Sequence, residues 1–461
     1  MGLATGSATA EQLQATARDH LWSHFTNLSS FQKTELPVIV SGDGCHVVDA
    51  HGKRYLDGLS GLFATQIGYS HGEEIGEAAA AQMRELPYFP NWAHAHPRVL
   101  ELSAEITELA PGDLSRAFFC SGGSEAVESA WKLARQYYAT KGERRWKVIA
   151  RRYAYHGTTM GALSINGIPG LRGPYEPLVP GVSHVWNTDR FHRPPEETEE
   201  QFTRFLLQDL EAALVQADPA SVAMVIMEPV QNQGGSLVAP AGYWAGVREI
   251  CDRYGILLCA DEVITGFGRL GAWFGSELYD IRPDIATCAK GLASGYAPIG
   301  AVIASDDVAA PFLDGSGVFT HGFTYGGHPV SCAIALKNIE IMRRERVIEH
   351  VAENQDALRA TLEQLLELPI VGDVRGTGYF LTIELIKDRD THTTMSMPER
   401  ERLFRGFLAP ALFERGLICR AEERIAPLIQ ISPPLIAGQA EFDGMVEILA
   451  DVLREAPQHI G

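Results

Sequence analysis

Two ionisable residues stand at the ends of two short apolar runs. Asp261 closes the run that begins at Leu257, and Lys290 follows the run 285–289, 29 residues after Asp261. A lysine amine can bond covalently to an aldehyde, and an aspartate can hold a pyridine nitrogen protonated, so that the ring accepts electrons. These are the two groups that pyridoxal phosphate (PLP) chemistry requires. Alone, each residue is also typical of a strand cap or a solvated loop, but their joint placement favours a PLP site.

A glycine-rich turn upstream could bind an anion. The apolar residues 118–120 run into Ser121-Gly122-Gly123-Ser124, and a helical pattern follows from Ala126. The N-terminus of a helix presents free backbone N–H groups and the positive end of the helix dipole, which together attract a phosphate. By itself the same sequence is equally typical of a simple turn between a strand and a helix.

The composition of the chain restricts its class. With 461 residues the chain exceeds the usual size of one domain, so we expect two lobes or one large α/β domain with an appendage. The 46% hydrophobic content is ordinary for a globular protein with a large core. The formal charge of −19 argues against general binding of nucleic acid or an anionic membrane.

The cysteine pattern and the N-terminus indicate a cytoplasmic protein. The seven cysteines form no CxxC pair and no metal-binding spacing, which suits a reducing compartment. His94 and His96 form a pair without an evident third ligand, so no metal site is predicted. The N-terminus lacks an apolar signal core, and no run approaches the length of a membrane helix.

Strand and helix patterns alternate from about residue 71 to residue 320. Nearly continuous apolar strands are typical of a parallel sheet that is covered on both faces, and the helical stretches between them supply the crossovers. The strands predicted in this region are 117–120, 147–150, 182–186, 222–227, 256–260, 285–289 and 300–304.

The N-terminal and C-terminal regions show a different pattern of expected helices and strands. A possible helix at 8–25 is followed by short strands at 38–40 and 45–49, and the region after Val330 starts with a long helix. Short strands and a final helix, 440–455, complete the C-terminal region. We predict three parts: an N-terminal segment, 1–70, that joins the small domain, a large PLP-binding domain, 71–329, and a small C-terminal domain, 330–461.

Several segments resemble the class III PLP-dependent aminotransferases, between about Pro37 and about Leu453. They are DGLSGLFATQIGYSHG, SGGSEAVESAWKLAR, YHGTTMGAL, MEPVQNQGG, LLCADEVITGFGRLGAWFGSELYDIRPDIATCAKGLASGYAPIG and HGFTYGGHPVSCA. The resemblance implies an α/β protein of PLP fold type I, similar to aspartate aminotransferase. Such a protein has a large domain around a mostly parallel seven-stranded sheet and a smaller α/β domain.

The resemblance also implies roles for residues around PLP. It implies that Lys290 and Asp261 are the catalytic residues. Thr324 matches a threonine that reaches the phosphate from the neighbouring subunit, so a homodimer or a dimer of dimers with shared active sites is expected. The other matching residues are Gly123 and Ser124 at the phosphate, Tyr155 and Val263 on the two faces of the ring with His156 beside Tyr155, and Glu228 near the phenolic oxygen. From the residues alone, a buried tyrosine usually only packs, and Glu228 could be a strand cap.

Lys290 is expected first to bond to the PLP aldehyde and then to carry a proton. Once the substrate amine has taken its place, the freed Lys290 amine is within reach of the substrate Cα proton and can carry it. The result is a ping-pong reaction, in which an amine is first converted to a carbonyl product and an oxo acid is then aminated.

The sequence leaves open which arginine binds a substrate carboxylate. Some class III enzymes use an arginine before a double proline, and here the match to that motif begins with Gln430, with Arg424 in a competing register. Arg420 resembles the mobile arginine of the amine:pyruvate (ω-) transaminases, which pairs with a carboxylate and turns away for a carboxyl-free amine. Arg424 in that role, or a plain surface arginine in a charged loop, remains an alternative.

Four further residues match or suggest the walls of a substrate pocket. Leu62 and Phe63 match wall positions of the ω-transaminases, and Tyr88 and Trp92 are aromatic candidates that suit an apolar amine, although each could equally pack in a core.

The sequence therefore predicts a transaminase that moves an amino group from an alkyl, aryl or diamine donor to pyruvate. An enzyme for ω-amino acids (β-alanine or 4-aminobutyrate) with pyruvate or 2-oxoglutarate is the alternative within the family. A non-catalytic PLP-binding regulatory protein is the alternative from another class, and the intact Asp261 and Lys290 argue against it.

Overall fold

The computed structural model describes residues 9–32, 34–315, 317–389 and 391–460. Its centre is a seven-stranded sheet with the strand order β4-β12-β11-β10-β7-β5-β6. Neighbouring strands are parallel except for β12, which is antiparallel to both β4 and β11. The strands are β4 (Leu114–Cys120), β5 (Lys147–Arg151), β6 (Val182–Val185), β7 (Val222–Met227), β10 (Leu257–Asp261), β11 (Ile285–Cys288) and β12 (Gly300–Ser305).

Helices cover both faces of this sheet, which explains its apolar strands. Side chains alternate between the two faces of a strand, so on β7 Met224 packs with helix α5 (Gly123–Thr140) and Val225 packs with helices α8 (Glu199–Gln216) and α9 (Tyr243–Tyr254). Both residues are fully buried. A strand that is buried on both faces reads as a continuous apolar run, which is how the sequence predicted it.

The remaining helices around the large sheet connect its strands, precede it or, in the case of α11, follow its last strand. They are α2 (Ser60–Phe63), α3 (Gly72–Glu85), α4 (Pro97–Leu109), α6 (Met160–Ile165), α7 (Pro169–Arg172), α10 (Gly275–Leu278) and α11 (Asp306–Leu313). A two-stranded hairpin, β8 (Val230–Gln231) with β9 (Leu237–Val238), follows β7.

The C-terminal region forms a second, antiparallel sheet with the order β13-β14-β17-β16. Its strands are β13 (Val371–Thr377), β14 (Phe380–Leu385), β16 (Arg420–Glu422) and β17 (Leu428–Ile431). The helices of this region are α12 (Pro329–Arg344), α13 (Val347–Glu363), α14 (Met397–Leu403), α15 (Ala409–Glu414) and α16 (Gln439–Glu455).

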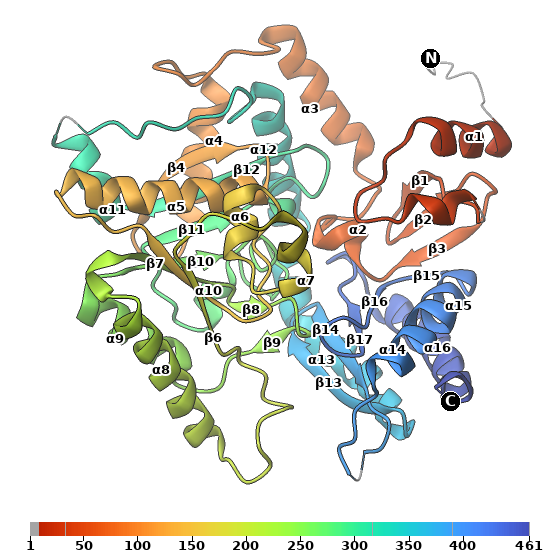
Figure 1. Cartoon of the computed structure of the whole chain (residues 1–461). Helices are drawn as coiled ribbons and strands as arrows, with labels where there is room; N and C mark the ends of the chain where they lie inside the picture. The colour runs from red at the N-terminus through yellow and green to blue at the C-terminus, as the bar shows by residue number, and fades with distance from the viewer. Residues whose placement is uncertain (1–8, 33, 316, 390, 461) are drawn as a thin grey trace.

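The N-terminal segment pairs with the C-terminal region. Helix α1 (Ala10–His20) precedes a sheet in which β1 (Ile39–Asp43), β2 (His46–Asp49) and β3 (Arg54–Asp57) are joined by β15 (Leu417–Ile418), which is parallel to β3. Figure 1 shows these red and orange strands beside the blue C-terminal elements. The division into 1–70, 71–329 and 330–461 stays a prediction, which the pairing of β3 with β15 supports.

The fold class predicted from the sequence is confirmed, and the element bounds differ in places. The helix predicted at 8–25 ends at His20; Ala8 lies outside the described residues. The single long helix predicted after Val330 is two helices, because Arg346 between α12 and α13 takes a left-handed conformation with φ 52°. No helix of the described ranges is long and apolar enough to cross a membrane.

Candidate active site

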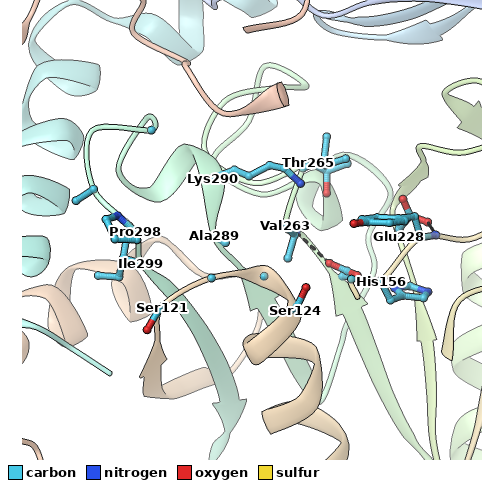
Figure 2. A pocket seen from close by; sticks show the side chains of 18 of the residues that line it. Ser121, Ser124, His156, Glu228, Val263, Thr265, Ala289, Lys290, Pro298 and Ile299 are labelled. Carbon is cyan, nitrogen blue, oxygen red and sulfur yellow. Dashed lines mark hydrogen bonds and ion pairs between the residues drawn. The ribbon is translucent and has the colours of Figure 1, made fainter. Parts of the chain in front are cut away.

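Polar side chains gather where the parallel strands of the large sheet end. Asp261 is the last residue of β10, Glu228 follows β7, and Lys290 follows β11. In open α/β sheets this edge is where ligands bind. A cavity of about 460 Å³ opens there, which falls within the range of roughly 300 to 1,000 Å³ for small-molecule sites. Figure 2 shows the Lys290 side chain extending into the cavity above the turn that carries Ser121 and Ser124.

The register of β10 and β11 brings Asp261 and Lys290 to the same place. Asp261 pairs with Thr287 across the two parallel strands, and Lys290 stands three residues beyond Thr287. The Thr287 hydroxyl donates a 3.0 Å hydrogen bond to Oδ1 of Asp261, and the backbone N–H of Val263 donates a second one, of 3.1 Å. The Asp261 carboxylate is therefore held by the strands that deliver it, with its position set by backbone pairing.

Lys290 presents its amine inside the protein. It stands at the start of a short 3₁₀ turn, Lys290–Leu292, in a left-handed backbone conformation with φ 36°, which is uncommon for a residue other than glycine. Burial lowers the pKa of the Lys290 amine to about 8, while the charges of Asp261 and Glu228 oppose this shift. A large fraction of the amine is thus neutral near pH 8, and the neutral form is the one that attacks a carbonyl or accepts a proton.

The first turn of α5 forms the opposite wall of the cavity. Ser121, Gly122, Gly123 and Ser124 all line it, and the first N–H groups of a helix have no partner within the helix. A side chain at position 123 would meet the Val263 side chain at 2.8 Å, so only glycine allows the turn to lie this close to Val263. The result is a cradle of backbone N–H groups at the positive end of the helix dipole.

Tyr155 and Glu228 line the cavity from the ends of β5 and β7. The Glu228 carboxylate accepts hydrogen bonds from the backbone N–H groups of Tyr155, at 3.4 Å, and of Asn232, at 2.9 Å. Burial raises the pKa of the Glu228 carboxyl, and burial likewise raises the pKa of the Tyr155 hydroxyl. Both groups are fixed beside Lys290, where they can contact a bound ring.

These groups fit PLP. The cavity offers an amine for the aldehyde, a buried carboxylate for the ring nitrogen and a helix N-terminus for the phosphate, in one enclosure of suitable volume. Gly123 leaves the cradle open where a Cβ would fill it. When it is bound, PLP supplies an aldehyde that captures an amine and a ring that accepts electrons. In the described ranges, no group of three His, Cys, Asp or Glu side chains could hold a metal ion.

The cavity brings together most of the predicted site residues. Those that line it are Gly123, Ser124, Tyr155, His156, Glu228, Asp261, Val263 and Lys290. Six further predicted residues do not line it within this chain: Leu62, Phe63, Tyr88, Trp92, Thr324 and Arg420. The roles of all of them in binding cofactor or substrate stay predictions.

Thr324, Tyr88 and Trp92 gather on the surface, away from the cavity of their own chain. The Tyr88 hydroxyl donates a 2.8 Å hydrogen bond to the carbonyl oxygen of Thr324. Trp92 is 63% exposed and lies against Gly322. This placement agrees with a threonine that serves a neighbouring subunit, because a single chain does not bring Thr324 to its own cavity.

Leu62 and Phe63 lie in a kinked turn, and they differ in burial. Leu62 is exposed, and Phe63 is buried with its ring 5.6 Å from that of Phe380 in an edge-to-face arrangement. Phe63 shares a hydrophobic cluster with Val230 and Ile264, which do line the cavity. Within one chain Phe63 therefore supports the wall from behind, where the sequence predicted a residue of the wall itself.

Arg420 lies on a strand, where the sequence indicated a loop. It is the first residue of β16, and it pairs across the sheet with Gln430 of β17. Its Nη2 lies 2.6 Å from Oε2 of Glu422. The charge of Arg420 contributes to lowering the pKa of Lys290. Of the two arginines that the sequence left open, Arg420 also contacts the buried side chain of Gln233, and the choice between them stays a prediction.

Several residues of the site escaped sequence reasoning. Thr287 binds Asp261, Gln233 lies against Arg420, and Glu422 is the ion-pair partner of Arg420. A signal existed for Glu422, because residues two apart on a strand face the same side. No local signal existed for Gln233, which reaches Arg420 only through the packing of the hairpin against the second sheet.

The seven-stranded sheet, the buried lysine and the aspartate define an enzyme of PLP fold type I. Residues 29–453 match the class-III aminotransferase family, and the chain belongs to it. It is therefore a PLP-dependent aminotransferase, which moves an amino group from an amine donor to an oxo-acid acceptor.

Three similar proteins illustrate the family. A probable aminotransferase of Mycobacterium tuberculosis is 51% identical over 445 residues, which cover 96% of this chain and 94% of that protein. The putrescine–pyruvate aminotransferase of Pseudomonas aeruginosa is 36% identical over 450 residues and 96% of both chains. The crystal structure of an (S)-enantioselective omega-transaminase from Thermomicrobium roseum superposes with a TM-score of 0.92 at 40% identity, over 97% of this chain and 99% of that one.

Proposed function

We propose that the protein transfers an amino group from an alkyl, aryl or diamine donor to pyruvate, and that it works as a homodimer or a dimer of dimers. The observation that carries the proposal is the position of Arg420 on β16, directly across the sheet from Gln430 on β17. Where an amino-acid-specific relative would have a fixed arginine, this chain has a neutral amide, Gln430, which is buried and donates to the carbonyl oxygen of Asn232 at 3.0 Å. The positive charge is instead on Arg420 of the neighbouring strand β16, and it is already paired with the Glu422 carboxylate.

That arrangement suits two unlike substrates in one cavity. A carboxyl-free amine would leave a fixed buried arginine unpaired, at a cost of about 3–5 kcal/mol. Arg420 does not face this penalty, because Glu422 neutralises it when no substrate carboxylate is present. When pyruvate enters, the guanidinium can bind its carboxylate through two parallel N–H···O bonds. The putrescine–pyruvate aminotransferase among the relatives supports this pair of substrates.

The chain's own groups divide the chemistry between them. Lys290 accepts the proton from the substrate Cα and returns it, because its amine is the buried base beside the cavity and its pKa of about 8 lies near neutral pH. Asp261 stabilises positive charge on the bound ring nitrogen, and Glu228 and Tyr155 fix the ring. The N-terminus of α5 binds the phosphate.

Dimer formation would complete the site. Thr324, Tyr88 and Trp92 share one exposed surface that also includes Phe89 and Tyr325, and exposed aromatic patches of this kind mark protein interfaces. We infer that this surface meets a second copy, so that Thr324 of each subunit reaches the phosphate of the other. Trp92 and Tyr88 then stand where they can wall the partner's substrate cavity.

A matrix of donors and acceptors tests the proposed substrates. The holoenzyme is offered a diamine, an aryl-alkyl amine, β-alanine and 4-aminobutyrate, each with pyruvate and with 2-oxoglutarate, and the new amino acid is quantified. We expect the highest kcat/KM for the carboxyl-free amines with pyruvate. A clear preference for β-alanine or 4-aminobutyrate would overturn the proposal in favour of an ω-amino-acid enzyme. Absence of transfer from all four donors would refute the proposed class of substrates.

A further inference from the structure

One carboxylate serves two arginines beside the active-site cavity. The side chain of Glu422 is only 5% exposed; its Oε2 lies 2.6 Å from Nη2 of Arg420 and its Oε1 lies 2.6 Å from Nε of Arg424. The two arginines differ in exposure, since the side chain of Arg420 is 22% exposed and that of Arg424 is 48% exposed. Arg424 is thus the nearer of the two to solvent, whereas the guanidinium of Arg420 contacts the buried side chain of Gln233. The charge of Arg420 acts to lower the pKa of Lys290 and opposes the rise that burial causes in the pKa of Tyr155.

The other side of Arg420 is occupied by a neutral group. The amide oxygen of Gln233 accepts hydrogen bonds from Nη2 and, at 3.1 Å, from Nη1 of Arg420. The amide takes this orientation because the reverse would set its N–H groups against the guanidinium. Gln233 therefore fills the two-pronged end of the guanidinium, which is the position a carboxylate takes in a bidentate pair.

Hydrogen bonds hold the loop that carries Gln233 in place. Its neighbour Asn232 donates a backbone hydrogen bond to Glu228 at 2.9 Å and accepts one from the Gln430 amide at 3.0 Å. Arg375 donates to the carbonyl oxygens of the next two residues, Gly234 and Gly235, at 2.8 Å each. The backbone around Gln233 is thus held in place. A carboxylate that binds Arg420 would need only the side chain of Gln233 to rotate away.

We propose that Glu422 is a built-in competitor of the substrate carboxylate and that Arg424 sets the strength of this competition. The inference rests on the proposed function, in which Arg420 binds the carboxylate of the oxo acid. Glu422 would then be a positioning residue that decides how readily Arg420 accepts a carboxylate, and Arg424 would weaken its hold by claiming the other oxygen.

The signs of the expected effects follow from this sharing. Replacing Glu422 with glutamine removes the competing charge, so the guanidinium of Arg420 binds a carboxylate more tightly. Replacing Arg424 with glutamine leaves Glu422 entirely to Arg420, so a carboxylate binds more weakly. Substitutions at the last residue of β16 and two residues after it should therefore act in opposite directions, which loss of local structure would not produce.

The chain offers a matched control one residue away. Glu423 is also a nearly buried glutamate, but its partner is Arg405, with Nη2 2.6 Å from Oε1. Glu423→Gln makes the same chemical change and the same change of net charge as Glu422→Gln. Only the latter removes the partner of Arg420, so the pair separates a specific competition from a general increase in positive potential.

The test measures binding of propionate, a carboxylate of pyruvate's size without its reactive carbonyl, to the PLP-loaded holoenzyme by calorimetry. Propionamide serves as the neutral counterpart. We expect Glu422→Gln to bind propionate about fivefold more tightly and Arg424→Gln about fivefold more weakly, with propionamide and Glu423→Gln unchanged within about twofold. Single-turnover rates with pyruvate should follow the same order through the substrate concentration at half-saturation.

The outcomes separate two failures. If Arg420→Ala leaves propionate binding unchanged, Arg420 is not the carboxylate group, and that part of the proposed function fails. If Arg420→Ala weakens binding but Glu422→Gln does not strengthen it, or Glu423→Gln strengthens it equally, the competition alone is refuted. Should Glu422→Gln not fold, Arg424→Gln decides the matter at a half-exposed position: unchanged or tighter propionate binding overturns the inference.

Discussion

Nδ1 of His156 lies 2.6 Å from Oδ2 of Asp261, with both side chains almost completely buried. Together with Thr287 and the backbone of Val263 on Oδ1, this contact leaves the Asp261 carboxylate no freedom to rotate. Three donors from three segments thus aim one carboxylate into the cavity. A carboxylate that is oriented before the ligand arrives needs no reorganisation when charge develops on the ring, which is how preorganised electrostatics contribute to catalysis.

Asp261→Asn should keep the cofactor and lose activity. The amide has the same shape and can still contact Thr287, but it cannot stabilise a protonated ring nitrogen. We expect kcat to fall by about 100-fold or more, while calorimetric binding of PLP changes much less. Thr287→Val, which removes one donor to Asp261 and leaves its charge, should have a much smaller effect. A variant Asp261→Asn with near wild-type kcat would show that Asp261 has a structural role only.

The Lys290 amine should titrate near pH 8. Burial lowers its pKa to about 8, so the neutral, reactive form predominates above that pH. The rate at which the apoenzyme captures PLP, followed by absorbance, should therefore rise with pH up to about 8 and then level off. Lys290→Ala should bind PLP without the covalent link and should abolish turnover. Persistent transamination by Lys290→Ala, or capture that is independent of pH between 7 and 9, would contradict this role.

Much of the site was predictable because its signals are local. Asp261, Glu228 and Lys290 each end or follow an apolar run, and the cavity brings all three together as expected. Arg420 was harder to place, because β16 is three residues long and pairs with a strand ten residues away. The short strands of the second sheet depend on long-range register, which an individual segment does not encode.

The surroundings of Arg420 show most clearly which contacts a sequence does not predict. Gln233 and Arg420 are far apart in the sequence, and they meet because Arg375 of the second sheet holds the backbone next to Gln233. Phe63 was expected in the pocket wall, which stays a prediction, and within one chain its ring packs against that of Phe380, more than 300 residues away in the sequence. Apolar patterns predict burial, and they do not tell which cluster a side chain joins.

Mixed dimers test whether Thr324 crosses between subunits. If Thr324 serves the neighbouring site, a dimer of one Thr324→Ala and one Lys290→Ala subunit contains one doubly damaged site and one intact site. Purified mixed dimers should then show about half the wild-type activity per dimer and one tight PLP site. An assembled mixed dimer without a wild-type-like site would place both residues in the same subunit's site.

His192 should couple stability to alkaline pH. Burial lowers its pKa, but hydrogen bonds to Asp189 at 2.8 Å and Glu384 at 3.0 Å outweigh this and raise the pKa to about 10. The pKa of an unfolded histidine is about 6.5. The stabilisation is therefore complete below pH about 6.5 and disappears as the pH rises through about 10.

Melting temperatures of His192→Gln check this coupling. The variant should melt about 2 °C below the wild type at pH 6 to 7, because the side chain is partly exposed, and the gap should close above pH 10. His24→Gln, at an exposed position, should show no gap at either pH. A gap that stays constant from pH 6 to pH 10.5 would mean that packing, and not charge, accounts for the effect.

The most direct test follows the two half-reactions separately by absorbance. In the wild-type holoenzyme, a simple amine should change the cofactor spectrum, and pyruvate added after removal of the amine should restore it. Arg420→Ala should slow the pyruvate step by about tenfold or more at low pyruvate, because a charge-assisted pair is lost, and it should slow the amine step far less. A spectrum that pyruvate does not restore, equal losses in both steps, or an effect found only in Arg424→Ala would contradict a transaminase that switches between an amine and pyruvate through Arg420.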